Sequence, residues 1–217
     1  MKRTHTENDS TPVFREPVKI VLLGDGCIGK STLFNKLSKL TDANYQFPKK
    51  YCATDNFDFN RLRINTNVGI VQVDLWDTAG QENRGGKLRD AYLKGADGVL
   101  LLYDVSEPNT VANIPKWLEQ VRKICHYAPV AVIGNKSDKF ENLQQSESVK
   151  LRECNLQRDV GHSNIKNFLI SIKEDTHIEF VSSFWSSNVS IKEEPKCLIG
   201  LEYVLSNIFT HTITIKY

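Results

Sequence analysis

The sequence predicts an α/β domain with a mostly parallel sheet, and three observations support this fold class. Short apolar runs alternate with segments whose apolar residues recur at helical spacing, a pattern typical of helices packed on a parallel sheet. Glycine-rich or polar motifs directly follow three of the expected strands. Two of the runs flank Asn65-Thr66-Asn67, which predicts a hairpin and therefore one antiparallel edge strand.

Each expected element follows from its own pattern. Val18–Leu23 is an apolar run that ends at a glycine, as a buried strand does, and Ser31–Leu40 has apolar residues at helical spacing. Phe57–Ile64 and Val68–Trp76 form the hairpin, and the second of them alternates in the manner of a half-buried strand. The other expected strands are Gly98–Tyr103, Pro129–Gly134 and the weaker Ile178–Val181. The other expected helices are Gly86–Lys94, Ala112–Tyr127 and Pro195–Phe209.

The domain boundaries follow from where these patterns begin and end. Residues 1–16 are polar and patternless, so we expect a flexible N-terminal tail. The domain then covers residues 17–210, and residues 211–217 form a C-terminal tail. Within the domain, residues 139–177 form a less regular, variable or inserted segment, with helical-looking pieces near Ser148–Leu156 and Ile165–Ile172.

Composition excludes several classes of function. A formal net charge of +2 gives no overall basic field to attract nucleic acid. The five cysteines form no metal-binding spacing and no disulfide framework, which indicates reduced thiols in an intracellular protein. The apolar runs are too short to span a membrane. The last cysteine, Cys197, falls inside the expected final helix, so we expect no lipid anchor.

The first chemical motif is GDGCIGKS, at residues 24–31, between the first strand and the first helix. Glycines let the backbone wrap closely around phosphates and point its N–H groups inward. Lys30 places a positive charge on the β- and γ-phosphates, and Ser31 offers a hydroxyl to Mg²⁺. The helix that begins here adds its positive N-terminal end. The motif therefore predicts a phosphate-binding loop.

The second motif, DTAGQE at residues 77–82, directly follows the strand VQVDLW. Asp77 can hold Mg²⁺ through its water shell, and Gly80 can bring a backbone N–H to the γ-phosphate. Gln81 can orient an attacking water. These roles predict a site that cleaves the nucleotide as well as binding it.

The third motif, NKSD at residues 135–138, follows PVAVIG and indicates which base is bound. The Asp138 carboxylate can accept hydrogen bonds from N1–H and the exocyclic amine of guanine, whereas adenine has no donor at N1. Sites that recognise by hydrogen bonding reject the wrong ligand by roughly 10⁴–10⁵. Asn135 can tie loop segments together, and the Lys136 stem can cover the base. Asp138 therefore disfavours an ATP-dependent kinase.

With these motifs the chain resembles the Ras superfamily of small GTPases from about Val18 to Phe209. The resemblance implies a P-loop fold with a six-stranded, mostly parallel sheet and helices on both faces. It also implies binding of GTP and GDP with Mg²⁺, slow hydrolysis of GTP, and two loops that report the γ-phosphate. Lys30 and Gln81 are the expected catalytic residues. The expected nucleotide contacts are Gly24, Asp25, Gly26, Cys27, Ile28, Gly29, Lys30, Ser31, Thr32, Thr54, Asp77, Gly80, Asn135, Lys136, Asp138, Ser182, Ser183 and Phe184.

Two of these assignments depend on the resemblance alone. The first switch loop should contain a threonine that meets Mg²⁺ and the γ-phosphate, and Thr54 is the residue that matches, so the expected Mg²⁺ ligands are Ser31 and Thr54. The base-binding loop after the sixth strand usually reads Ser-Ala-Lys in this family. Here the matching stretch is Ser182-Ser183-Phe184. Phe184 replaces the lysine, and it either packs beside the base or closes the core.

The branch of the superfamily is ambiguous. Stretches such as Lys50–Thr54 and Asn113–Trp117 look like Ran, the nuclear-transport GTPase, whereas Gly95–Gly98 and Leu102–Ser106 look more like Rab, the vesicle-traffic branch. We expect a monomeric, Ran-like switch in the nucleus and cytoplasm. Its partners would be an exchange factor, a GTPase-activating protein and transport receptors, with no direct contact to nucleic acid. The alternatives are a Rab-like switch and a GTP-binding module with little hydrolysis.

Overall fold

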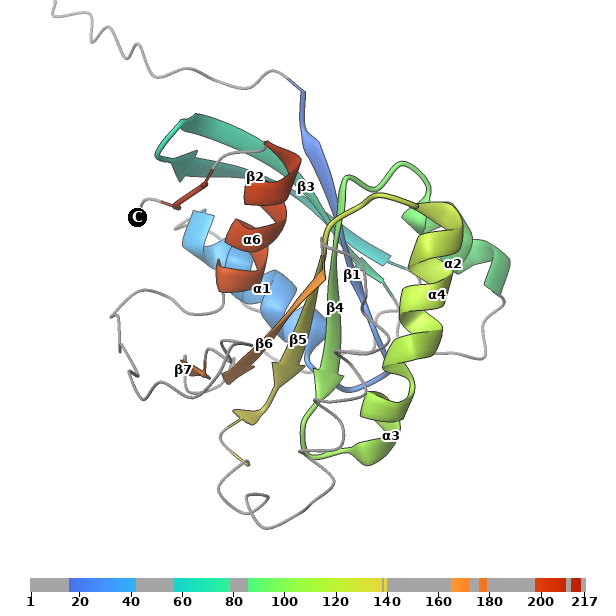
Figure 1. Ribbon diagram of the computed structural model, residues 1–217. Helices are drawn as coiled ribbons and strands as arrows, with labels where there is room; N and C mark the ends of the chain where they lie inside the picture. The colour runs from blue at the N-terminus through green and yellow to red at the C-terminus, as the bar shows by residue number, and fades with distance from the viewer. Residues whose placement is uncertain are drawn as a thin grey trace, which may run out of the picture.

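The computed structural model describes the parts of the chain that build the sheet and most of its helices. The described residues are 16–41, 57–78, 86–137, 139, 165–171, 176–178, 198–209 and 212–215. Together they form one twisted sheet with helices on both faces (Figure 1). This arrangement confirms the predicted α/β class.

The sheet has seven strands within the described residues, in the order β2-β3-β1-β4-β5-β6-β7. Five central strands, β3, β1, β4, β5 and β6, run parallel, and each edge strand, β2 or β7, pairs antiparallel with its neighbour. The strands are β1 (Val18–Leu23), β2 (Phe57–Thr66), β3 (Gly69–Thr78), β4 (Gly98–Asp104), β5 (Val130–Asn135), β6 (Ile165–Ser171) and β7 (Thr176–Ile178).

The helices divide between the two faces of the sheet. On one face lie α1 (Lys30–Thr41) and α6 (Ile199–Ile208). On the other lie α2 (Gly86–Leu93), α3 (Pro108–Ala112) and α4 (Ile114–Ile124) (Figure 1). Strand β1 contributes side chains to the hydrophobic core on each face of the sheet. Ile20 and Leu22 face α1 and α6, whereas Val21 and Leu23 face the other side. A continuous apolar run is what a strand covered on both faces requires.

The region between β5 and α6 differs from the prediction. Residues Ile165–Ser171 form a strand and not the expected helical piece, because they pair in parallel with β5 from Val130 to Gly134. The sheet therefore has one more strand than the predicted six, and a second antiparallel pair at its other edge. A short run rich in isoleucine fits either a helix or a strand by its pattern alone, and pairing with an existing edge decided between them. The other helical-looking piece, Ser148–Leu156, lies outside the described residues.

Three further elements also differ from the prediction. The expected helix Ala112–Tyr127 is observed as α4, from Ile114 to Ile124, and the short helix α3, from Pro108 to Ala112, was not predicted. The final helix, expected to start at Pro195, is described as α6 from Ile199. The strand β7, from Thr176 to Ile178, shares only Ile178 with the weak strand expected at Ile178–Val181, whose other residues lie outside the described part of the chain. None of the helices in the described residues has both the length and the apolar character to cross a membrane.

Residues 212–215, in the expected C-terminal tail, pack against the domain. Ile213 and Ile215 are buried in the core that α1 and α6 share. Asn67, in the β2–β3 turn, donates its main-chain N–H to the oxygen of Thr214 at 3.0 Å, and its side chain accepts from the Thr214 N–H at 2.9 Å. The Glu202 carboxylate of α6 accepts from the N–H of Ile215. This short segment thereby joins the hairpin turn to α6.

Candidate functional site

The carboxyl ends of the parallel strands bring the predicted motifs to one edge of the sheet. Asp77 lies beside Leu22 in the β1–β3 pair, so the second motif begins next to the phosphate-binding loop. Asp104 lies beside Asn135 in the β4–β5 pair. Ligands bind at this edge of parallel α/β sheets because the loops that follow the strands converge there. The structure therefore places the described parts of all three motifs at one site.

The phosphate-binding loop is a tight turn that only glycine permits at two positions. Gly24 and Gly29 have φ angles of 128° and 102°. A Cβ on Gly24 would lie 2.2 Å from the carbonyl oxygen of Leu102 in β4. Ile28 anchors the loop because its side chain is buried in the core. Helix α1 then begins at Lys30, so its positive N-terminal end faces the loop.

Lys30 lies at the centre of this loop and is only 6% exposed. Its Nζ donates to the main-chain oxygens of Gly24 at 3.0 Å and Asp25 at 2.5 Å. Burial lowers the Lys30 pKa to about 8, and the negative charges of Asp77 and Asp25 partly oppose this shift. A buried ammonium group in this loop is suited to bind an anion. Burial disfavours its charged form, and the negative charge of a phosphate stabilises that form again.

Asp77 and Ser31 supply oxygen donors of the kind that Mg²⁺ prefers. The Asp77 side chain is fully buried at the end of β3, and its charge acts on Lys30. The neighbouring Thr78 hydroxyl donates to the main-chain oxygen of Leu22 at 2.7 Å, which fixes the end of β3 against β1. Ser31 lies in the first turn of α1, directly after Lys30. These residues fit the predicted Mg²⁺ site.

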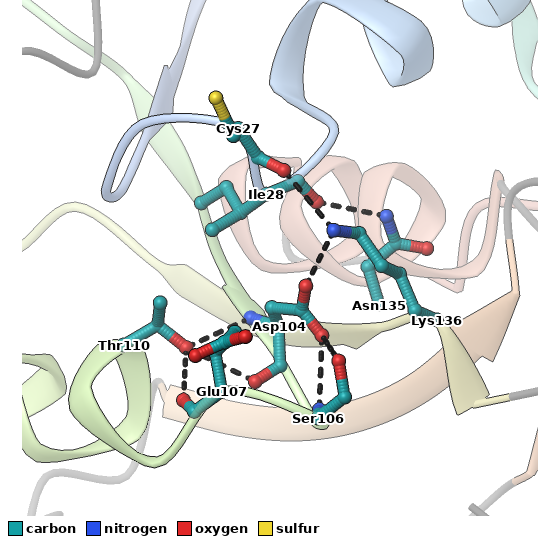
Figure 2. Close-up of polar contacts among 8 residues, drawn as sticks. All are labelled: Cys27, Ile28, Asp104, Ser106, Glu107, Thr110, Asn135 and Lys136. Atoms are coloured by element: carbon teal, nitrogen blue, oxygen red, sulfur yellow. Dashed lines mark hydrogen bonds and ion pairs between the residues drawn. The ribbon is translucent and has the colours of Figure 1, made fainter. Parts of the chain in front are cut away.

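The loop after β5, which is the predicted base-reading loop, is bonded directly to the phosphate-binding loop. The Asn135 amide donates to the main-chain oxygen of Ile28 at 2.8 Å, and Lys136 Nζ donates to the oxygen of Cys27 at 3.1 Å (Figure 2). Lys136 has a φ of 65°, so its backbone turns sharply as β5 ends. The predicted role of Asn135 in tying loop segments together is thus supported by its contacts.

Asp104 is a candidate site residue that the sequence analysis missed. Its buried carboxylate forms an ion pair with Lys136 and accepts hydrogen bonds from the Ser106 N–H and hydroxyl (Figure 2). Burial raises the pKa of this carboxyl, but the bonds from Lys136 and Ser106 outweigh it and lower the pKa. Thr110 secures the same turn through the Asp104 main chain. The signal in the sequence was an acidic residue at the end of an otherwise apolar strand.

Ser171 is a second candidate that the sequence reasoning missed. It is the last residue of β6, and Leu169 two positions earlier pairs with Gly134, so β6 ends beside the base-reading loop. β7 runs antiparallel to β6, so its carboxyl end points toward the opposite edge of the sheet. Ile172 and Lys173 follow Ser171 in the sequence. A serine and a lysine therefore stand at the Ser-Ala-Lys spacing, a signal that the expected helix concealed.

The remaining predicted site residues cannot be placed, because they lie outside the part of the chain that the structure describes. They are Thr54, Gly80, Gln81, Asp138, Ser182, Ser183 and Phe184. The described loop and helix start contain Gly24, Asp25, Gly26, Cys27, Ile28, Gly29, Lys30, Ser31 and Thr32, as the sequence predicts.

Comparison with protein families agrees with this geometry. A model of the Ras family matches residues 19–190, which is most of the chain. The match runs from β1 through β7, and so includes every strand of the sheet and each motif at its carboxyl edge. Members of this family bind GTP and GDP, hydrolyse GTP, and interact with exchange factors, activating proteins and effectors. The chain therefore belongs to the Ras family and is a small GTP-binding protein.

Proposed function

We propose that this protein retains a Mg²⁺–guanine nucleotide at the carboxyl edge of its sheet, hydrolyses GTP slowly, and signals through the difference between its GTP and GDP forms. The observation that carries this proposal is the bond from Asn135 to Ile28. It joins the loop that reads the base to the loop that holds the phosphates, so one ligand spans both.

The roles of the individual side chains follow from their places. Lys30 neutralises negative charge on the phosphates, and its burial makes this interaction stronger than it would be in water. Ser31 and Thr54 would hold Mg²⁺, and Asp77 would hold its water shell; an ion held there would supply positive charge at the β- and γ-phosphates. Gln81 orients the attacking water, and the Gly80 N–H faces the γ-phosphate. The intrinsic rate is slow, because GDGCIGKS and DTAGQE contain no arginine, and an arginine supplied by a partner commonly raises such rates by roughly 10³–10⁵.

The base is read by Asp138 together with a loop that follows a strand of the sheet. We propose that this second loop begins at Ser171, because β6 ends beside β5 whereas β7 points away from the site. The assignment to Ser182, Ser183 and Phe184 remains the alternative. Substituting Lys173 by alanine and, separately, Phe184 by alanine distinguishes them: the residue in the base loop changes GDP affinity, and the other does not.

We further propose a Ran-like role in nucleocytoplasmic transport, with a nuclear and cytoplasmic location. A Rab-like role in vesicle traffic is the alternative, and the two predict different partners. Affinity capture with the GTP-bound Gln81→Leu variant should recover transport receptors. Recovery of membrane tethers alone would favour the Rab-like role.

Phosphate release from GTP in the presence of Mg²⁺ tests the hydrolytic function. We expect slow release by the wild type, still slower release by Gln81→Leu, and competition by GDP but not by ATP. Tight guanine-nucleotide binding with no phosphate release, even with an activating protein, would instead identify a binding module. Competition by ATP as strong as that by GDP would contradict the guanine assignment.

A further inference from the structure

Asp25, the second residue of the phosphate-binding loop, is bonded through its side chain to the α3–α4 region. One carboxylate oxygen accepts from the Asn113 amide at 2.8 Å, and the other accepts from the Trp117 indole N–H at 2.8 Å. Both oxygens of the carboxylate are therefore engaged by neutral donors that lie about 90 residues away in the sequence.

The two donors reach the same carboxylate because of how α3 meets α4. Asn113 lies between the last residue of α3 and the first residue of α4, and its main-chain oxygen accepts from the Trp117 N–H at 3.1 Å. Residues four apart lie on one face of a helix. The Trp117 ring is buried in the core beneath α4, which leaves its N–H directed at Asp25.

The orientation of Asp25 matters because this residue interacts with Lys30. Its main-chain oxygen accepts a hydrogen bond from Lys30, the cation at the centre of the loop. Its negative charge also acts on Lys30, where it opposes the fall in pKa that burial causes. A carboxylate this close to a phosphate-binding lysine competes with the phosphates for that lysine and repels them, unless it is held in a fixed orientation.

We propose that Asn113 and Trp117 are positioning residues of the nucleotide site: they fix the Asp25 carboxylate on the helical side of the loop, away from the phosphates. This inference depends on the proposed function, because it concerns how tightly that site retains GDP and GTP. It predicts that loss of the two donors accelerates nucleotide release because the carboxylate is freed. Removal of that carboxylate should therefore slow the release again.

The test is the rate at which GDP with a fluorescent ribose label leaves the full-length protein. In Asn113→Ala/Trp117→Phe, where an aromatic ring still fills most of the space but both donors are lost, we expect release about tenfold faster than in the wild type. Adding Asp25→Ala to this pair should slow release again, close to the rate of Asp25→Ala alone. A triple variant that releases GDP as fast as the double variant would overturn the proposal, because a purely structural role for α4 gives no rescue.

Two controls keep the result interpretable. Trp76→Phe removes an indole N–H that has no hydrogen-bond partner within the described residues, and it should leave GDP release unchanged. Trp117→Phe alone retains most of the packing and serves in place of the double variant if the latter does not fold, with the same rescue expected. A wild type that retains no guanine nucleotide would overturn the proposed function, whereas retention without rescue overturns this inference alone.

Discussion

The side-chain amide of Asn135 donates a 2.8 Å hydrogen bond to the main-chain oxygen of Ile28, so the loop after β5 and the loop after β1 are held as one unit. Both residues are buried. Loss of the donor to a buried carbonyl is unfavourable by about 1–3 kcal/mol. Because this bond joins the two loops that are proposed to hold the nucleotide, we expect it to govern how long the nucleotide stays bound.

Asn135→Ala should therefore accelerate GDP release by about tenfold. Exchange of fluorescently labelled GDP measures this rate. Asn207→Ala is the matched control, since Asn207 makes a comparable amide-to-carbonyl bond to Tyr203 on the exposed side of α6, far along the chain from the motifs. Equal release rates in the two variants would contradict the importance of the Asn135 bond.

Cys27 has a φ of 60°, which is a left-handed conformation that side chains with a Cβ adopt at a cost. Cys27→Gly removes that cost, which is about 1–3 kcal/mol, and loses part of the gain to the greater freedom of glycine in the unfolded chain. We expect a net increase of about 0.5–1 kcal/mol in the free energy of unfolding, measured by urea denaturation. Cys27→Ala retains the strained backbone, so stabilisation of that variant by the same amount would refute the explanation.

Gly24 has both a positive φ and no room for a side chain, because a Cβ would lie 2.2 Å from the Leu102 carbonyl oxygen. Gly24→Ala should lower the free energy of unfolding by about 3 kcal/mol or more. Gly95 also has a positive φ, but nothing lies within 4 Å of the position that a Cβ would occupy there, so Gly95→Ala should cost about 1 kcal/mol from strain alone. Thermal unfolding compares the two, and similar losses would mean that close packing at Gly24 is unimportant.

Lys30 should make nucleotide affinity depend on pH. Burial lowers its pKa to about 8 in the free protein, and a bound phosphate raises that pKa again. Binding above this pH therefore takes up a proton, and the affinity should fall as pH rises, by at most about tenfold per pH unit. Calorimetry in buffers of different ionisation enthalpy measures the proton uptake. An affinity that stays constant as pH rises above about 8 would contradict this prediction.

Lys30 should also make the stability of the nucleotide-free protein depend on pH, in the opposite direction to the affinity. Its folded-state pKa of about 8 lies below the ordinary lysine value of 10.5, so the unfolded chain binds more protons between these values. The contribution of Lys30 to the free energy of unfolding therefore rises with pH across this window, and is least favourable below it. Lys30→Met should remove that rise, which denaturation at a series of pH values detects.

Ile215 tests whether residues 212–215 belong to the folded domain. Its side chain is buried in the α1 and α6 core, so Ile215→Ala should lower the free energy of unfolding by about 2–4 kcal/mol. Thr214→Ala changes an exposed side chain next to it and should have little effect. Equal stability of both variants by urea denaturation would show that this segment contributes nothing to the domain.

Several parts of the fold and site could be predicted because their signals are local. The run from Val18 to Leu23 is apolar throughout except for Lys19, as is typical of a strand covered on both faces. The turn that follows it, from Gly24 to Lys30, begins with a positive φ that glycine adopts readily. Asp77 and Asn135 directly follow apolar runs in the sequence, and because parallel strands end at one edge of a sheet, both were expected at that edge.

Other parts depended on contacts between distant segments. Ile165–Ser171 suits a helix or a strand by its own pattern, and pairing with β5 decided the outcome. Trp117 is buried, but the direction of its N–H toward Asp25 depends on where α4 packs, which its local sequence does not contain. Likewise, nothing local predicts that Asp104 pairs with Lys136.

By itself, the sequence determined the α/β class, the phosphate-binding loop and the motifs expected at the carboxyl edge of the sheet, since backbone conformation and residue type are properties of short segments. Only the tertiary structure decided the seventh strand, the docking of Ile213 and Ile215, and the bonds that hold Asp25 and Lys136 in place. The physical reason is that each of these features is stabilised by contacts between segments far apart along the chain. Each therefore depends on a partner that the local sequence does not contain.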